Sequence, residues 1–311
     1  MYTIGLVDRA LCPLLDAMPT DTLSVETLHA LREREFPMPA FANCGVSLET
    51  ISIPGPGGAP EILLHIYRPD GERDLRPCIY HIHGGGFVAG SAKQFESIHR
   101  PLCAELDCVI VSVDYRLAPE TVFPGAIEDC YAALTWTIAN AHRLGIDTAR
   151  IGVLGESAGG GLAASLALLA RDRGELELAF QVLIYPMIDD RTCIREANPF
   201  AGEFIWTAHN NHFGWSSLLG HDPGGQDVSP YAAAARAADL SNLPPTFIST
   251  GALDLFVDED SDYAIRLIRA GVPTEFHVYP GAFHGFDLMP DAEIAVEIGR
   301  ASCRERVSSP V

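Results

Sequence analysis

A serine flanked by glycines is the part of this sequence best suited to covalent chemistry. Residues 155–160 read Gly-Glu-Ser-Ala-Gly-Gly and fit the pattern G-x-S-x-G, with Ser157 at the centre. The hexapeptide follows an apolar run at 151–154 and precedes a helix-like run at 161–170. This is the strand–turn–helix context of a nucleophile elbow. We therefore predict that Ser157 lies on a sharp turn, with its hydroxyl ready to attack a carbonyl carbon.

A serine hydroxyl needs a base to take its proton, and the base needs a carboxylate to orient it. With this elbow the three residues follow along the chain in the order Ser, acid, His. We predict that His284 is the base, because it follows the last predicted strand and has glycines on both sides. The other histidines considered fit less well: His142 lies in a helical pattern, His277 in a strand, and His209 and His212 in a long insertion.

The orienting carboxylate is predicted to be Asp254. It comes just after the predicted strand at 246–250, where a catalytic loop is expected. Its main rival is Asp258, which with Glu259 precedes a predicted helix. Acidic residues at that position are explained by helix capping and by the helix dipole. Asp254 has no such structural explanation, so we favour it.

A run of three glycines, Gly84 to Gly86, directly follows the predicted strand at 78–82. Glycines let backbone N–H groups approach a substrate oxygen, and the N–H that follows the nucleophile, on Ala158, is a further donor. No Gly-Lys-Ser/Thr follows, so the run is not a phosphate loop. His81 and His83 have no third ligand at a matching spacing, so we predict no metal site.

The rest of the chain predicts an α/β fold. A hairpin is expected from strands at 47–53 and 61–68 around a Pro/Gly turn. Strands and helices then alternate, which implies a mainly parallel sheet with right-handed crossovers. The strands are expected at 78–82, 109–113, 151–154, 182–185, 246–250 and 275–279, and the helices near 94–106, 125–143, 157–172 and 258–270.

The predicted catalytic domain comprises residues 46–186 and 243–297. Residues 187–242 are expected to form a lid over a pocket, because this insertion has no clear strand and is rich in aromatic residues. The alternative is that the insertion only buries its own apolar face. Aromatic residues of this insertion such as Phe204, Trp206 and Trp215 are expected to fill the pocket and so to set the substrate preference.

The composition and charge of the chain exclude some classes of binding partner. The chain has 311 residues, 48% of them hydrophobic, and a net charge of −20. Such an acidic protein is repelled by nucleic acid and by anionic membranes, and no stretch approaches the ~18 apolar residues of a membrane span. The first residues do not form a signal peptide. The eight scattered cysteines are expected to be free thiols in a reducing cytoplasm.

The end of the chain has an unusual sequence. Residues 298–307 read Ile-Gly-Arg-Ala-Ser-Cys-Arg-Glu-Arg-Val, which resembles the translation of a sequencing-adapter oligonucleotide. We expect residues 298–311 to be a non-native tail and exclude them from the fold.

Several motifs together resemble those of the hormone-sensitive-lipase-like esterases, bacterial lipolytic family IV, over about residues 45–290. They are the His-Gly-Gly-Gly at 83–86, the Tyr-Arg-Leu-Ala-Pro-Glu at 115–120, the elbow at 155–160, Asp254, and the His-Gly-Phe at 284–286.

The resemblance implies an α/β-hydrolase fold with a helical cap built from residues 1–45 and 187–242, no cofactor, and hydrolysis of short acyl esters. It implies Ser157 as nucleophile, His284 as base and Asp254 as orienting acid. The oxyanion donors that it implies are the backbone amides of Gly85, Gly86 and Ala158. Glu156 stands where the family commonly has aspartate, and the C-terminus departs from the terminal helix usual in the family.

Within residues 114–116, Asp-Tyr-Arg, we predict a structural role: an ion pair and packing that fix the glycine run. The substrate is expected to be a small-molecule ester. Alternatives are an amidase or peptidase with the same three residues, or a non-catalytic ligand receptor, which the presence of all three disfavours. The last predicted strand, 275–279, offers an edge for a homodimer.

Overall fold

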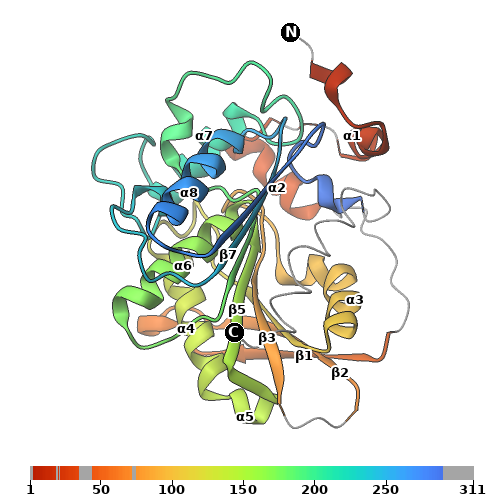
Figure 1. Ribbon diagram of the computed structural model, residues 1–311, viewed down its shortest axis with the longest axis vertical. Coiled ribbons are helices and arrows are strands. Elements are labelled where there is room, and N and C mark those ends of the chain that lie inside the picture. Colours follow the sequence, from red (N-terminus) through yellow and green to blue (C-terminus); the bar gives the residue numbers. More distant parts are fainter. Residues whose placement is uncertain (1–2, 19, 21, 35–43, 72–74, 290–311) are drawn as a thin grey trace.

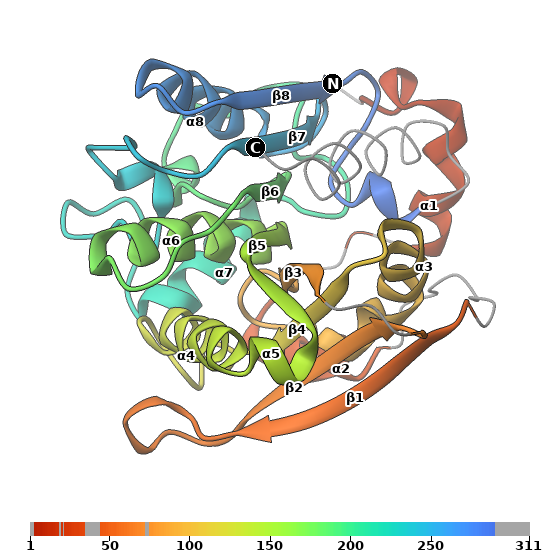
Figure 2. The ribbon, with the colours of Figure 1, turned by 60° about the horizontal axis from the view of Figure 1, so that its bottom comes forward.

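A computed structural model of the chain describes residues 3–18, 20, 22–34, 44–71 and 75–289. Its centre is one eight-stranded sheet in the order β1-β2-β4-β3-β5-β6-β7-β8 (Figures 1 and 2). The strands are β1 Val46–Ile53, β2 Ile62–Pro69, β3 Arg76–Ile82, β4 Val109–Asp114, β5 Ile146–Glu156, β6 Gln181–Ile184, β7 Thr246–Gly251 and β8 Thr274–Tyr279.

The sheet is antiparallel at one edge and parallel elsewhere. The hairpin β1–β2 and the pair β2–β4 are antiparallel, and every pair from β4 to β8 is parallel. The parallel strands β3, β4, β6 and β7 are short and buried along nearly all their length, as expected for strands covered by helices on both sides. The predicted mostly parallel α/β sheet is therefore confirmed, with the carboxyl ends of β3, β5, β7 and β8 at the same edge.

Helices cover both faces of the sheet. In Figure 1, α4, α6 and α8 lie on one face and α3 on the other, while α1, α2 and α7 lie near the end where the parallel strands finish. The helices are α1 Cys12–Ala17, α2 Val25–Glu33, α3 Glu96–Leu106, α4 Gly125–Ala139, α5 Ala141–Leu144, α6 Ala158–Arg173, α7 Ala208–Leu219 and α8 Val257–Arg269.

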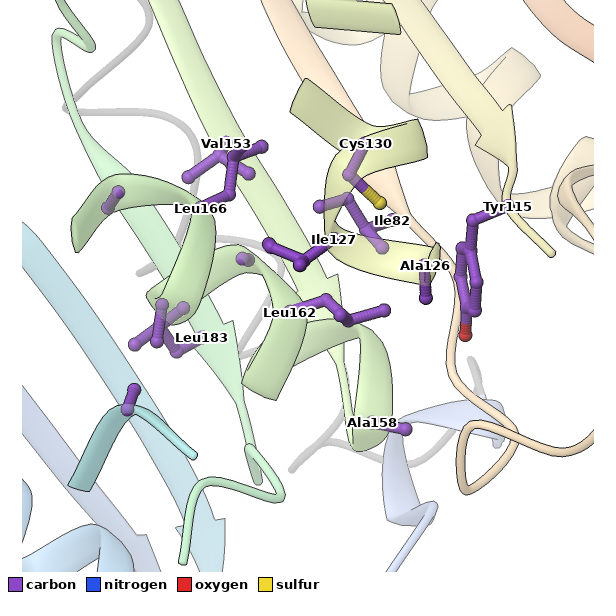
Figure 3. Close-up of a cluster of buried hydrophobic side chains, with 14 of the residues drawn as sticks. Ile82, Tyr115, Ala126, Ile127, Cys130, Val153, Ala158, Leu162, Leu166 and Leu183 are labelled. Atoms are coloured by element: carbon purple, nitrogen blue, oxygen red, sulfur yellow. The ribbon is translucent and has the colours of Figure 1, made fainter. Parts of the chain in front are cut away.

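The core between the sheet and α4 and α6 holds the elbow in place. Figure 3 shows Leu162 and Leu166 of α6 and Ile127 of α4 beside Val153 of β5 and Leu183 of β6. All five side chains are buried, and each such burial contributes about 1.5–3 kcal/mol. A second apolar cluster fills the opposite face of the sheet. The turn between β5 and α6 is thus fixed from both sides.

The predicted elements differ from the observed ones at a few places. The helix expected at 125–143 is broken at Asn140, whose side-chain amide donates to Trp136 O at 2.9 Å and competes with the backbone ladder. The strand expected at 151–154 is longer than predicted. Strand β5 continues to Glu156, so Ser157 is the next residue after the strand. The proposed non-native tail, 298–311, lies outside the described residues.

The N-terminal segment (3–34) and the insertion (187–242) contact each other. Asn210 Oδ1 accepts a hydrogen bond from Leu23 N at 2.9 Å, and Thr20 Oγ1 accepts one from Ile205 N at 2.9 Å. Glu203 accepts two bonds from Thr3. These two segments, far apart in sequence, therefore form one layer at the end of the sheet. None of the described helices is both long and apolar enough to cross a membrane.

Candidate active site

Ser157 lies on a strained turn between β5 and α6. Its φ of 56° and ψ of −122° are rare for a residue with a side chain. The turn is held by two backbone bonds, from Ser157 N to Ile184 O and from Met187 N to Ser157 O, both 2.9 Å. The helix also approaches β3 closely, since a Cβ on Gly159 would lie 2.0 Å from Ile82 O. The elbow expected from the sequence is present.

Ser157, His284 and Asp254 form a continuous hydrogen-bonded relay. His284 Nε2 lies 2.9 Å from Ser157 Oγ, and His284 Nδ1 lies 2.9 Å from Asp254 Oδ2. The relay is buried, with exposed fractions of 7% for the serine, 6% for the histidine and 1% for the aspartate. The second oxygen of Asp254 accepts a bond from Phe256 N at 3.0 Å, which fixes the carboxylate. The geometry suits proton transfer from serine to histidine.

The acid and the histidines that fitted the sequence pattern less well lie outside this relay. Asp258 is exposed in the first turn of α8, where an acid suits the helix dipole. His277 lies in β8 and contacts Glu275 at 2.6 Å, and His142 lies in α5. His209 contacts Leu23 O. None of these four residues joins the relay.

Aromatic rings surround His284. Its ring centroid lies 4.6 Å from that of Tyr185 and 5.3 Å from that of Phe256, so the imidazole has little freedom to turn. Tyr185 donates a hydrogen bond to Asp287, whose pKa burial raises to about 6. Sequence reasoning missed Tyr185. Its position at the end of β6, on the catalytic edge of the sheet, is the signal that could have revealed it.

The glycine loop, residues 84–90, passes beside the elbow. Gly85 and Gly86 have φ values of 117° and 61°, and a Cβ on Gly86 would lie 2.1 Å from the Trp206 ring. Within the part of the chain that the structure describes, the amides of Gly85, Gly86 and Ala158 donate no hydrogen bond. They are therefore available to a substrate oxygen at Ser157.

The segment 114–116 supports this loop, as expected. Tyr115 donates to His83 O at 2.9 Å, and its ring stacks on the His83 ring at 4.3 Å. The ion pair of Arg116 is with Asp129, through two bonds of 2.7 Å. Asp114 instead accepts a bond from Ala92 N at 2.5 Å. The segment thus holds the start of the glycine loop by packing and hydrogen bonds.

Glu156, immediately before the nucleophile, contacts a buried histidine. Its two carboxyl oxygens lie 3.0 and 3.3 Å from His81 Nε2, and His81 Nδ1 lies 2.7 Å from Ser112 Oγ. Burial raises the pKa of Glu156 to about 8 and lowers that of His81 well below its usual range. Both shifts favour the neutral forms, a carboxyl group on Glu156 beside an uncharged His81 ring. Among the described residues, no group of three or more His, Cys, Asp or Glu could hold a metal ion.

A cavity of about 240 Å³ opens above Ser157. Its walls are mostly apolar. The N-terminal segment contributes Ala17, Met18, Leu23, Leu31 and Arg34, and the insertion contributes Ile205, Trp206 and Asn210.

Of the three cap aromatics expected to fill the pocket, only Trp206 lines it. Phe204 instead packs on Phe283, with ring centroids 5.6 Å apart, and Trp215 is fully buried against Phe87. The expectation for Phe204 and Trp215 was therefore wrong. Both rings face the core, because the insertion must bury its own apolar surface.

Comparisons with known proteins agree with this geometry. Residues 79–288 match a family described as alpha/beta hydrolase fold. Carboxylesterase NlhH of Mycobacterium tuberculosis is 36% identical over 286 residues, which cover 90% of this chain and 88% of that protein. A solved structure titled Bacterial Heroin Esterase has a TM-score of 0.90 at 39% identity, covering 99% of this chain and all 100% of that one. An esterase of Pyrobaculum calidifontis has a TM-score of 0.81 at 34% identity, covering 97% and 100%.

Proposed function

This chain belongs to the α/β hydrolase family, in its hormone-sensitive-lipase-like branch, and we propose that it is a serine carboxylesterase acting on short-chain acyl esters. Its class, that of the carboxylic ester hydrolases, is supported by relatives named carboxylesterase and esterase. The observation that carries the proposal is the relay Asp254–His284–Ser157, with two contacts of 2.9 Å, at the floor of a mostly apolar cavity.

In the proposed reaction, His284 Nε2 takes the proton of Ser157 as Oγ attacks the ester carbonyl carbon. Asp254 holds the imidazole in position and stabilises its charged form. The tetrahedral intermediate collapses and expels the alcohol, which leaves with the proton from His284. Water then attacks the acyl-enzyme with His284 again as base, and the acid is released.

The negative oxygen of the tetrahedral intermediate needs donors that are already oriented. We assign this role to the amides of Gly85, Gly86 and Ala158. Gly85 and Gly86 line the same cavity as Ser157, and Ala158 follows Ser157 in the chain. These positions, and the lack of partners for the three amides among the described residues, support the assignment. Loss of one such donor typically reduces kcat ~10²- to 10³-fold.

A short acyl chain is proposed because the cavity is small. At about 240 Å³ it has room for a limited acyl or alcohol group between Trp206 and the wall formed by the N-terminal segment. We propose that residues 1–45 and 187–242 act together as the cap over residues 46–186 and 243–297. The contacts of Leu23 and Thr20 with the insertion support this division.

The test is a series of nitrophenyl esters from acetyl to dodecanoyl, with the matched nitroanilide at the best chain length. We expect the highest kcat/KM for the short acyl groups and at least ~10²-fold slower turnover of the anilide. Equal rates on ester and anilide would favour the amidase. Saturable ligand binding without any turnover would favour a receptor.

Two further expectations stay proposals. A reducing, cytoplasmic location is supported by the seven described cysteines, all of which are free. A homodimer through β8 is supported by its place at the edge of the sheet and by the 41% exposure of Val278.

A further inference from the structure

Arg32 lies in the cap layer, on α2, yet its guanidinium reaches the glycine loop. We propose that Arg32 is a positioning residue that holds the glycine loop in the shape needed to bind the oxyanion, and so couples the cap to the chemistry. The inference rests on the proposed esterase function. It concerns a residue that does not touch the reacting atoms.

The contacts of Arg32 form a clamp. Its Nε donates to Val88 O at 2.7 Å, and its Nη2 donates to Ala118 O at 2.8 Å. The two terminal nitrogens also donate to the two carboxylate oxygens of Glu120, each at 2.8 Å. One planar guanidinium thus joins three separate acceptors, a pattern that lysine with its single nitrogen cannot reproduce.

The two carbonyl groups that Arg32 bonds lie in the glycine loop itself or in a segment that is hydrogen-bonded to it. Val88 lies within the glycine loop, and its N donates to Gly85 O at 3.1 Å. Ala118 donates its own N to Phe87 O at 2.9 Å. Arg32 therefore acts on the loop twice, directly at Val88 and through Ala118 at Phe87, which is the residue next to Gly86.

The loop needs such support because its backbone is strained. Phe87 has a φ of 66°, a left-handed conformation that is unfavourable for a residue with a side chain. Gly85 and Gly86, just before it, also have positive φ values. A conformation of this kind persists only where surrounding bonds determine it. Without the clamp, the loop can relax toward an ordinary turn and move the amides of Gly85 and Gly86 away from Ser157.

Helix α2 carries both Arg32 and a residue of the cavity wall. Leu31, the neighbour of Arg32, lines the cavity, as does Leu23 just before the helix. In α2 itself only Leu28 is buried, so the helix is held mainly at a few points. When α2 lies in place to form the substrate wall, Arg32 also lies in place to hold the donors. Burying a substrate against this wall therefore favours the working form of the loop.

The Glu120 partner keeps the clamp oriented over the working pH range. The two hydrogen bonds from Arg32 lower the pKa of Glu120 to about 2, so the carboxylate is ionised at neutral pH. Glu120 is itself 63% exposed and bonds neither carbonyl of the clamp in the described structure. Its role is to fix the plane of the guanidinium.

The experiment compares Arg32→Gln, Arg32→Lys and wild type on the best short-chain ester. We expect Arg32→Gln to lower kcat about tenfold with KM changed less than about twofold, because the lost support acts in the transition state. The kcat of Arg32→Lys should lie between that of wild type and that of Arg32→Gln. The matched control is Arg150→Gln, since Arg150 is similarly exposed (33% against 28%) and pairs with Asp147 at the other end of β5.

A second readout separates positioning from a general loss of structure. Binding of a trifluoromethyl ketone, whose adduct with Ser157 places an oxyanion at the donors, should weaken in Arg32→Gln by the same factor as kcat. The unfolding midpoint and the binding of a ground-state ester to the Ser157→Ala, Arg32→Gln double variant should change little. If Arg32→Gln does not fold, Arg32→Lys and Glu120→Gln take its place, each with a smaller loss in kcat and ketone affinity together.

The inference is overturned if wild-type protein hydrolyses the ester and the Arg32 variants keep its kcat and its ketone affinity. It is also overturned if Arg32→Gln changes only KM, or if Arg150→Gln loses as much activity. Absence of turnover in wild type and in Arg150→Gln alike would instead overturn the proposed function, and this inference with it.

Discussion

Two helices border the same cavity and are held in opposite ways. Helix α6 carries the elbow at its start, and thirteen of its residues are buried between the sheet and α4. Helix α2 forms part of the cavity wall, and Leu28 is its one buried residue. The floor of the site is thus part of the protein core, whereas this part of the wall rests on a few hydrogen bonds, those of Arg32 foremost.

This difference separates two tasks. Residues that move protons must keep distances such as the 2.9 Å between His284 and Ser157, and the core enforces them. Residues that enclose the substrate must admit it and release it, so they lie in segments of low local stability. Changes in the floor should therefore reduce kcat, and so should changes in Arg32, which does not line the cavity but bonds the glycine loop. Changes in the residues that line the wall should instead alter KM and substrate preference.

The largest effect is expected in the floor, from Asp254→Asn. The asparagine would present the wrong hydrogen-bonding partner to His284 Nδ1, and we expect kcat to fall by ~10³- to 10⁴-fold. The control is Asp258→Asn, an exposed acid four residues further on, which should keep kcat within about twofold. Steady-state kinetics on one short ester measures both. A larger loss in the Asp258 variant would refute our choice of acid.

An intermediate effect is expected in the wall, from Trp206→Ala. Removing this ring enlarges the cavity, so we expect the preferred acyl chain to lengthen and KM for the short esters to rise about tenfold, with a smaller change in kcat. Phe204→Ala is the matched aromatic control. Because Phe204 packs on Phe283, its loss should lower the free energy of unfolding by about 2 kcal/mol and leave the chain-length preference unchanged. The reverse pattern would show that the two rings have been assigned wrongly.

The smallest effect is expected for Glu156→Gln, measured as stability against pH. The pKa of Glu156 is about 8 in the folded chain and near 4.5 when unfolded. Between these values the folded state keeps a proton that the unfolded state has released, so wild type loses stability as pH rises. We expect the glutamine variant to gain several kcal/mol of stability relative to wild type across this window and to keep that gain above it.

Denaturant unfolding of both proteins at several pH values checks this. A difference that shrinks as the pH rises toward 8 would contradict a neutral Glu156 in the folded state.

The sequence predicted the floor well and the wall poorly, for a physical reason. Ser157, Asp254 and His284 each follow a strand, and parallel strands bring their carboxyl ends to one edge whatever lies between them. No such rule determines which side chains line the cavity wall. Trp206 and Trp215 look alike in the sequence, yet one lines the cavity and the other fills the core. Arg32 could not be found either, because two of its acceptors are backbone carbonyls, which leave no trace in the residue types, and the third, Glu120, lies 88 residues away in the sequence.

The most direct test of the central claim is to identify the residue that becomes covalently modified. Wild-type protein treated with a fluorophosphonate and digested should carry one adduct, on the peptide that contains Ser157. The Ser157→Ala variant should carry none and should lose ester hydrolysis by at least ~10⁴-fold. An adduct on another serine, or undiminished hydrolysis by Ser157→Ala, would contradict the account.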